Sequence, residues 1–190
     1  MSERNINVPA DSLTAGELVA IAEKKAEEVI EKLKTFSFTL ALAESCTAGL
    51  VSGLLANTSG ASSVLWGSYV CYTQDAKVNM LSLDNDALNA NGLVSRETAC
   101  SMAEGALKKS GADLSAAVTG LAGPDSDGRV PGGTIWIAAA GQDAGTPDKA
   151  KLQTAEAKEF HFSGARNEVR LRAAAAVLEM ILEQIEKRGA

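Results

Sequence analysis

The chain has 190 residues, of which 46% are hydrophobic and 22% charged, with a formal net charge of −6 and a pI near 4.9. This length and composition are typical of one globular domain with a sizeable core, and an acidic surface disfavours binding to nucleic-acid phosphates. No apolar stretch approaches the length of a membrane span and the N-terminus lacks a signal-peptide core, so we expect no membrane partner and a cytoplasmic location.

The first predicted element is a helix opened by Thr14-Ala-Gly-Glu17, a capping-box pattern. Apolar side chains repeat along it at helical spacing, while charged residues fill the other face. We expect residues 1–35 to pack, through this helix, on a domain that spans residues 36–190. The apolar stripe consists of Leu18, Ile21, Val29, Ile30 and Leu33.

The next segment joins a predicted strand over 37–43 to a predicted helix over 46–57, and Ser45 lies at the turn between them. Such a turn aims free N–H groups and the positive end of the helix dipole at whatever contacts the serine, which suits a developing oxyanion. Ser45 is therefore a candidate nucleophile, although a plain helix N-cap is the simpler explanation of this serine. Cys46 competes for the role, since a thiol at a helix N-terminus can have a lowered pKa, but it lies about 100° round the helix from Ser45.

A second apolar run predicts a strand over 64–73, and Lys77 follows Tyr72 by five residues. A serine hydroxyl needs a base to take its proton, and with His161 as the only histidine, lysine is the favoured base. Ser–Lys pairs work where burial or a neighbouring cation keeps the amine neutral. On position alone, however, a solvated helix lysine explains Lys77 better.

The alternation of strands and helices along the chain indicates a three-layer α/β/α sandwich with a mixed, mostly parallel five-stranded sheet. The last two predicted strands are joined by a loop too short for a crossover helix, so we expect one antiparallel pair. The remaining predicted elements are short helices over 74–80 and 84–90, a helix over 95–110, strands over 113–119, 133–140 and 151–162, and a helix over 165–187.

The loop from Thr119 to Thr134 contains five glycines and two prolines between two buried strands. Glycines let backbone N–H groups approach a ligand closely, and open α/β sheets bind ligands at such strand ends. A surface loop without a ligand explains the composition equally well, because the spacing matches no phosphate-binding motif. Candidate partners for a phosphate are Arg129, Arg166 and Arg170, of which Arg170 is equally well explained as a surface residue.

The three cysteines are odd in number and widely spaced, and they form no Cys-x-x-Cys pair. With a single histidine available to complete a ligand set, we expect neither disulfides nor a metal site. The three are Cys46, Cys71 and Cys100.

Five ordered blocks resemble those of the CinA C-terminal domain family, from about Leu40 to the C-terminal helix. This resemblance implies a nicotinamide-nucleotide amidase (PncC-like), here expected as a stand-alone domain without a cofactor, and it implies a homo-oligomer. The blocks are Ala43-Glu-Ser-Cys-Thr-Ala-Gly49, Tyr72-x-x-x-Ala-Lys77, Gly92-Leu-Val-Ser95, Val118-Thr-Gly-Leu-Ala-Gly-Pro124 and Gly133-Thr-Ile-Trp136.

By this resemblance Ser45 is the nucleophile, assisted by Tyr72 and Lys77. The chain departs from the family at Ala48, where glycine is usual, at Leu93, where alanine is usual, and at Ala165, where an aspartate is usual. The residues expected to contact the substrate are Glu44, Cys46, Thr47, Ala48, Gly49, Gly120, Gly123, Gly133, Thr134 and Arg166.

The resulting hypothesis is hydrolysis of the carboxamide of nicotinamide mononucleotide, through an acyl-enzyme, to nicotinate mononucleotide and ammonia. Backbone N–H groups at the start of the 46–57 helix are expected to hold the oxyanion. The alternative is a non-catalytic nucleotide-binding or interaction module, which the changes at Ala48 and Ala165 keep open. A hydrolase of peptides or β-lactams is disfavoured, because Ala48 stands where a Ser-x-x-Lys motif needs lysine.

Overall fold

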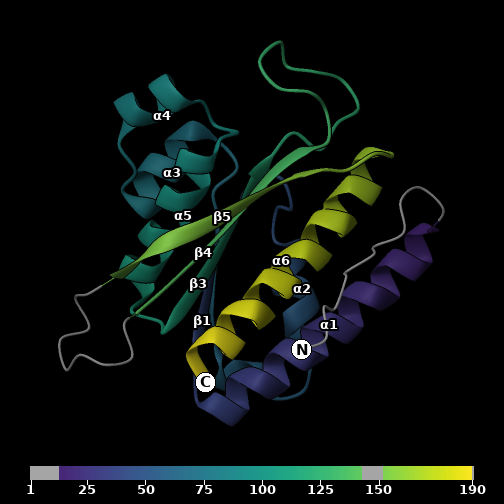
Figure 1. The fold of residues 1–190 in the computed structure, drawn as a ribbon, viewed down its shortest axis with the longest axis vertical. Helices are drawn as coiled ribbons and strands as arrows, with labels where there is room; N and C mark the ends of the chain where they lie inside the picture. Colours follow the sequence, from purple (N-terminus) through teal and green to yellow (C-terminus); the bar gives the residue numbers. More distant parts are fainter. Residues whose placement is uncertain (1–12, 143–151, 190) are drawn as a thin grey trace.

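The structure is a computed structural model that describes residues 13–142 and 152–189 (Figure 1). Among these residues no helix is both long and apolar enough to cross a membrane. The elements are α1 (Ala15–Phe36), β1 (Leu40–Glu44), α2 (Leu50–Ala56), a 3-10 turn (Ala61–Ser63), β2 (Leu65–Val70), α3 (Gln74–Leu81), α4 (Asn85–Asn91), α5 (Arg96–Ser110), β3 (Leu114–Gly120), β4 (Thr134–Gln142), β5 (Leu152–His161) and α6 (Arg166–Gly189).

The five strands form one sheet in the order β2-β1-β3-β4-β5. β1 pairs in parallel with β2 and β3, whereas β4 pairs antiparallel with both of its neighbours. Four strands therefore run in one direction, and the expected mixed, mostly parallel sheet is confirmed. The expected antiparallel pairing of the last two strands is confirmed, and β3 with β4 forms a second antiparallel pair that was not predicted. The loop that enters β4 carries no helix either, so β4 returns directly beside β3.

Helices cover both faces of the sheet, with α1, α2 and α6 on one side and α3, α4 and α5 on the other (Figure 1). Each face has its own buried apolar cluster. Along the central strand β3, Leu114, Ala116 and Val118 point to the α6 side, while Ala117 points to the α5 side. Burial on both faces is what a central strand of a three-layer sandwich requires.

Helix α1 begins with the expected capping box, since the Thr14 hydroxyl accepts from Glu17 N–H and the Glu17 carboxylate accepts from Thr14 N–H at 2.8 Å. The helix packs along α6, and small side chains at Ala22 and Ala26 lie fully buried within its apolar stripe. Ile21 of the expected stripe is only partly buried.

Candidate active site

Ser45 and Lys77 meet at the carboxyl end of the central strands. Ser45 directly follows β1, and its N–H donates to the carbonyl oxygen of Val118 in β3 at 3.0 Å. Lys77 lies in the first turns of α3, whose N-terminus is capped by the Thr73 hydroxyl. The Lys77 Nζ is 2.9 Å from Ser45 Oγ, although the two residues are 32 positions apart. Only 1% of Lys77 and 7% of Ser45 is exposed, so Lys77 is not a solvated helix lysine.

The surroundings of Lys77 favour a neutral amine. Burial lowers the pKa of Lys77 from its ordinary value, and the nearby Cys71 and Cys46 sulfurs, when ionised, act in the opposite direction. Its Nζ also donates to the Cys71 carbonyl oxygen at 2.9 Å, which fixes the position of the nitrogen. When the amine is charged it donates to Ser45, and when it is neutral its lone pair accepts from the Ser45 hydroxyl. The second arrangement is the one that a general base needs.

Cys46 lacks the properties of a competing nucleophile. Its side chain is buried in the apolar cluster on the α6 side of the sheet. Burial raises the pKa of the Cys46 thiol to about 12, because a thiolate there would lose its hydration. The thiol therefore stays protonated near neutral pH, and the lowered pKa considered for a helix N-terminus is absent.

The helix expected over 46–57 is wrong at its start, because α2 begins only at Leu50. Residues 46–49 form a turn in which Ala48 has φ 52° and Gly49 has φ 89°. A right-handed helix cannot continue through two left-handed residues, so the chain must begin the helix after them. The start of α2 is thus five residues beyond Ser45, not adjacent to it.

The first amides of α2 are occupied by Glu44, a carboxylate that is only 1% exposed. Its Oε2 accepts from Gly49 N–H, Val51 N–H and the Thr47 hydroxyl at 2.9, 3.1 and 2.8 Å. Its Oε1 accepts from Ser52 N–H and the Ser68 hydroxyl at 3.0 and 3.1 Å. Glu44 therefore caps α2 and ties it to β2, and the α2 amides that it binds are not free to hold an oxyanion.

The amides of the turn itself remain as candidate donors. Among the described residues, no oxygen accepts from the N–H groups of Cys46 or Thr47, and both groups lie close to the Cys46 sulfur. Their carbonyl oxygens are held from α6, since Arg170 Nε donates to Cys46 at 3.2 Å and Arg170 Nη2 donates to Thr47 at 2.7 Å. Arg170 therefore positions the Cys46–Thr47 turn, so it is not simply a surface residue of α6.

Close packing of neighbouring backbones explains two of the glycines in the 119–134 loop. A Cβ atom on Gly120 would lie 2.6 Å from the Thr134 carbonyl oxygen, and one on Gly133 would lie 2.0 Å from that of Phe162. These two glycines allow neighbouring backbones to approach each other closely. A Cβ on Gly123 would instead meet the Arg166 guanidinium at 3.0 Å, which places Arg166 against this loop.

Three expected site residues lie near this edge of the sheet, and none of them has a hydrogen bond to Ser45 or Lys77 among the described contacts. Tyr72 is 56% exposed and makes no hydrogen bond to either residue among the described contacts. Arg166 is exposed, and Thr134 is buried with its hydroxyl 3.4 Å from His161 Nδ1. Their roles towards a substrate, like those of Glu44, Cys46, Thr47, Ala48, Gly49, Gly120, Gly123 and Gly133, stay predictions.

Two hollows lie on the side of the sheet that α3, α4 and α5 cover. One of about 810 Å³ lies between the end of α4 and the 127–130 part of the glycine-rich loop, with Gln74, Leu93 and Arg129 among its lining residues. The Leu93 carbonyl oxygen accepts from the Thr119 hydroxyl at 2.7 Å. This hydrogen bond fixes one wall of the hollow to the end of β3. The lining residue Gln74 lies one turn before Lys77 on α3.

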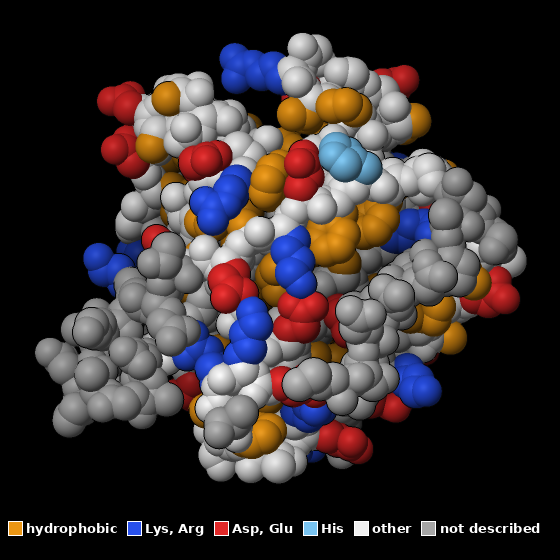
Figure 2. Space-filling model, in the orientation of Figure 1, with side chains coloured by type: hydrophobic (Ala, Val, Ile, Leu, Met, Phe, Trp, Pro, Cys, Tyr) orange, Lys and Arg blue, Asp and Glu red, His pale blue; other side chains and the backbone are white. Residues whose placement is uncertain are grey.

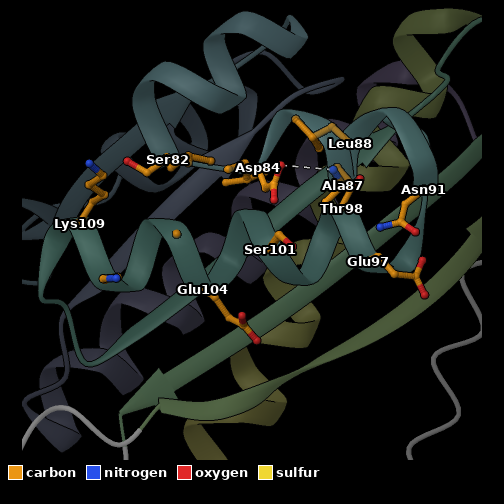
Figure 3. Close-up of a pocket in the computed structure, with 14 residues that line it drawn as sticks. Ser82, Asp84, Ala87, Leu88, Asn91, Glu97, Thr98, Ser101, Glu104 and Lys109 are labelled. Atoms are coloured by element: carbon orange, nitrogen blue, oxygen red, sulfur yellow. Dashed lines mark hydrogen bonds between the residues drawn. The ribbon is translucent and has the colours of Figure 1, made fainter.

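The other hollow, of about 650 Å³, is drawn in Figure 3. It lies between the α3–α4 connection and the outer face of α5, and neither Ser45 nor Lys77 lines it. Asp84 caps α4 by accepting from Ala87 N–H, the interaction dashed in the figure. Across the described part of the chain no group of three or more His, Cys, Asp or Glu residues could hold a metal ion.

Glu44→Gln is expected to lower the free energy of unfolding by about 2–4 kcal/mol, because the amide nitrogen cannot accept from Ser52 N–H and the helix cap loses its charge. Urea unfolding of both proteins measures the change. Ser68→Ala, which removes one neutral donor to the same carboxylate, is the matched control and should cost about 1 kcal/mol. An equal loss in the two variants would contradict the capping role.

Ala48→Gly is expected to raise the free energy of unfolding by about 0.5–1 kcal/mol, because glycine adopts a positive φ without the Cβ clash that alanine pays. Differential scanning calorimetry should show a melting temperature about 2–3 °C higher. Gly49→Ala adds the same methyl group at φ 89° and should shift the melting temperature downwards. A melting temperature that stays the same or falls in Ala48→Gly would mean that Ala48 carries no strain.

Comparison with known proteins gives one consistent family. The family model described as the CinA C-terminal domain matches residues 22–185, beginning within α1. A CinA-like protein of Thermotoga neapolitana is 36% identical over 168 residues, which cover 88% of this chain and 38% of that protein. A putative competence-damage inducible protein of Bacillus subtilis is 38% identical over 157 residues, which cover 82% and 35%. The chain thus spans little more than a third of the length of these two curated relatives.

Solved structures have the same fold. The competence/damage inducible protein CihA of Agrobacterium tumefaciens is 33% identical, with a TM-score of 0.76 over 87% of this chain and 96% of that one. A competence-damaged protein (CinA) superfamily protein of Escherichia coli is 26% identical, with a TM-score of 0.76 over 94% and 97% of the two chains. The three-layer architecture is therefore shared with structures that this chain covers almost completely.

Proposed function

The chain belongs to the family of the CinA C-terminal domain, and from this premise we propose that it is an amidohydrolase that converts nicotinamide mononucleotide to nicotinate mononucleotide and ammonia. The observation that carries the proposal is the 2.9 Å contact between Lys77 Nζ and Ser45 Oγ in a buried site. A buried charged lysine is costly for the fold unless it is paired or neutral, so a buried lysine beside a serine hydroxyl is a candidate functional group.

In the proposed mechanism the neutral Lys77 amine takes the Ser45 hydroxyl proton while Ser45 Oγ bonds to the carboxamide carbon. The N–H groups of Cys46 and Thr47 stabilise the resulting oxyanion. The C–N bond then breaks, and the Lys77 ammonium gives its proton to the departing nitrogen, which leaves as ammonia. Lys77 next deprotonates a water that attacks the acyl-enzyme ester, and the proton returns to Ser45 as the ester bond breaks.

Two further residues near the same edge of the sheet are candidates to contact the substrate. Arg166, exposed beside Gly123, is our candidate for the substrate phosphate, because a guanidinium binds phosphate through two parallel hydrogen bonds. Tyr72 is our candidate to assist proton transfer, which requires its exposed ring to turn towards Ser45 when substrate binds. Self-association into a homo-oligomer stays a prediction.

The proposal is tested by incubating the purified chain with nicotinamide mononucleotide and measuring the release of ammonia. We expect saturable turnover that depends on Ser45, with Ser45→Ala as the control protein. Saturable binding without ammonia release above that control would instead identify a non-catalytic nucleotide-binding module. Nicotinamide riboside, which lacks the phosphate, is expected to turn over with a higher KM if a phosphate contact contributes to binding.

A further inference from the structure

A small groove opens where α1, β5 and α6 meet, away from the proposed catalytic turn. Its volume is about 280 Å³, and its lining residues include Arg172, Phe160, Phe162, Met180, Lys25 and Lys158. Arg172 lies two residues after Arg170, which is about 200° round the helix. Since Arg170 faces the Cys46–Thr47 turn, the groove lies on the other side of α6.

Arg172 is the unusual member of this groove. It is only 7% exposed, its Nε is buried without a hydrogen-bond partner, and no ion pair or hydrogen bond engages its guanidinium within the described residues. A buried unpaired charge is costly, and native proteins normally satisfy the buried nitrogens of arginine. The groove therefore contains a cation that has no charged partner among the described residues.

The other charges that line the groove are already compensated. Lys25 forms an ion pair with Glu179, and Lys158 forms one with Glu183 at 2.6 Å. The Arg172 guanidinium accordingly leaves one net positive charge in the groove. A ligand that neutralises this charge carries a single negative charge, because a second negative charge would have no unpaired cation in the groove to bind it.

The rest of the lining is apolar and partly flat. The rings of Phe160 and Phe162 are stacked, with centroids 5.5 Å apart and an interplanar angle of 17°. Ala175, Ala176 and Met180 of α6 complete the apolar wall. Figure 2 shows hydrophobic side chains gathered near the single histidine, with lysine and acidic side chains around them. A flat apolar body fits such a wall, since planar groups stack favourably on aromatic rings.

We propose that this groove binds a small organic monoanion, of the class of single-ring aromatic carboxylates, with the carboxylate held by Arg172 and the ring held against Phe160, Phe162 and Met180. The groove volume of about 280 Å³ has room for a ligand with one ring, because it lies just below the usual range for pockets that bind drug-sized ligands. The planar guanidinium matches a carboxylate through two parallel hydrogen bonds. The site is separate from the proposed amidase centre and does not depend on that function.

Benzoate is the probe, and its binding to the full chain is measured by calorimetry. We expect saturable binding with Kd of order 1 mM, since a one-ring ligand has few atoms with which to gain affinity. Arg172→Met keeps an unbranched apolar side chain but removes the guanidinium, and it should raise the benzoate Kd at least about tenfold. Benzyl alcohol, which has the ring without the charge, and acetate, which has the charge without the ring, should each bind at least about tenfold more weakly than benzoate.

The matched control is the double variant Lys158→Met/Glu183→Gln, which removes a whole ion pair from the same groove without changing its net charge. It should keep the benzoate Kd within about twofold. Without ligand, Arg172→Met should melt at or above the wild-type temperature, because it removes an unpaired buried charge. Only the wild type and the double variant should be stabilised by benzoate.

Equal benzoate affinities in wild type and Arg172→Met would overturn the proposal, as would the absence of saturable binding to wild type. A melting temperature of Arg172→Met well below that of wild type would do the same, because it would mean that the fold already satisfies the guanidinium. If Arg172→Met changes the molar mass in light scattering while benzoate does not bind, a carboxylate of a second copy of the chain occupies the groove and the small-anion proposal is wrong.

Discussion

Ser45→Ala is expected to lower kcat/KM for nicotinamide mononucleotide by about 10³-fold or more, because removal of a covalent nucleophile abolishes the acyl-enzyme route. The neighbouring substitution Cys46→Ala should change kcat/KM by less than about threefold, since a buried thiol with a pKa of about 12 supplies no thiolate near neutral pH. The same ammonia assay measures both variants at equal protein concentration.

The two variants control for each other, because both remove one heavy atom at adjacent positions of the same turn. Circular dichroism and melting temperature establish that each is folded. Cys46→Ala leaves a small void in a buried cluster and should cost about 1 kcal/mol of stability, whereas Ser45→Ala should cost no more. The reverse ranking of activities would assign the chemistry to Cys46. Alkylation of wild type is less decisive, since an adduct on Cys46 could block the site whichever residue attacks.

The layered fold could be predicted because it rests on long-range patterns, whereas Lys77 was favoured as the partner of Ser45 by the scarcity of other bases and by the family resemblance. Apolar runs separated by helical segments specify which residues form the central strands, and carboxyl ends of parallel strands meet at one edge. Ser45 follows one such run and Lys77 follows the next, so strand pairing in parallel brings the two together. Position in the sequence alone still favoured a solvated lysine, because burial of Lys77 depends on the packing of α3 against the sheet.

The start of α2 could not be predicted, because local propensity and tertiary contacts disagree there. Alanine is a strong helix former, yet Ala48 has a positive φ. The turn is held by two charged residues from outside it: Glu44 binds the first amides of α2, and Arg170 binds the carbonyl oxygens of Cys46 and Thr47. Arg170 lies 124 residues from Cys46, and its helical spacing gave no sign of this contact.

This turn also changes how the oxyanion is expected to be held. Sequence reasoning assigned the task to the N-terminus of α2, but Glu44 occupies the amides there. In our proposal a buried carboxylate orders the helix, an arginine orders the turn, and the N–H groups of Cys46 and Thr47 are left for the substrate. Preorganised donors of this kind cost no rearrangement at the moment of reaction.

Lys77→Arg is expected to reduce kcat/KM by about 10³-fold or more, although it preserves the positive charge. Guanidinium does not give up its proton in the accessible pH range, so it cannot serve as the base. The larger planar group must also fit a position that is only 1% exposed and hydrogen-bonded to the Cys71 carbonyl oxygen. Lys77→Met is the companion variant, because it removes both base and charge while retaining an unbranched side chain of similar length.

The wild-type pH profile provides the independent measurement. An unperturbed lysine has a pKa near 10.4 and is almost entirely charged at pH 7, whereas burial lowers the pKa of Lys77. The active form is the neutral amine, so kcat/KM should rise with pH through the lowered pKa and then level off. Because the unfolded chain binds the Lys77 proton more tightly, stability from this group should also rise with pH between the folded and unfolded pKa values. Lys77→Met should lack that contribution.

Retention of substantial turnover by Lys77→Arg would show that Lys77 is not the base. The lysine would then act as a fixed charge towards the oxyanion or the phosphate, and proton transfer would pass to Tyr72 or to a water. The denaturant experiment separates this outcome from a simple loss of structure, since the difference in unfolding free energy between wild type and Lys77→Met depends on pH only if Lys77 titrates differently in the folded chain. A pH-independent difference combined with an inactive Lys77→Arg would mean that steric fit, rather than the proton, accounts for the loss.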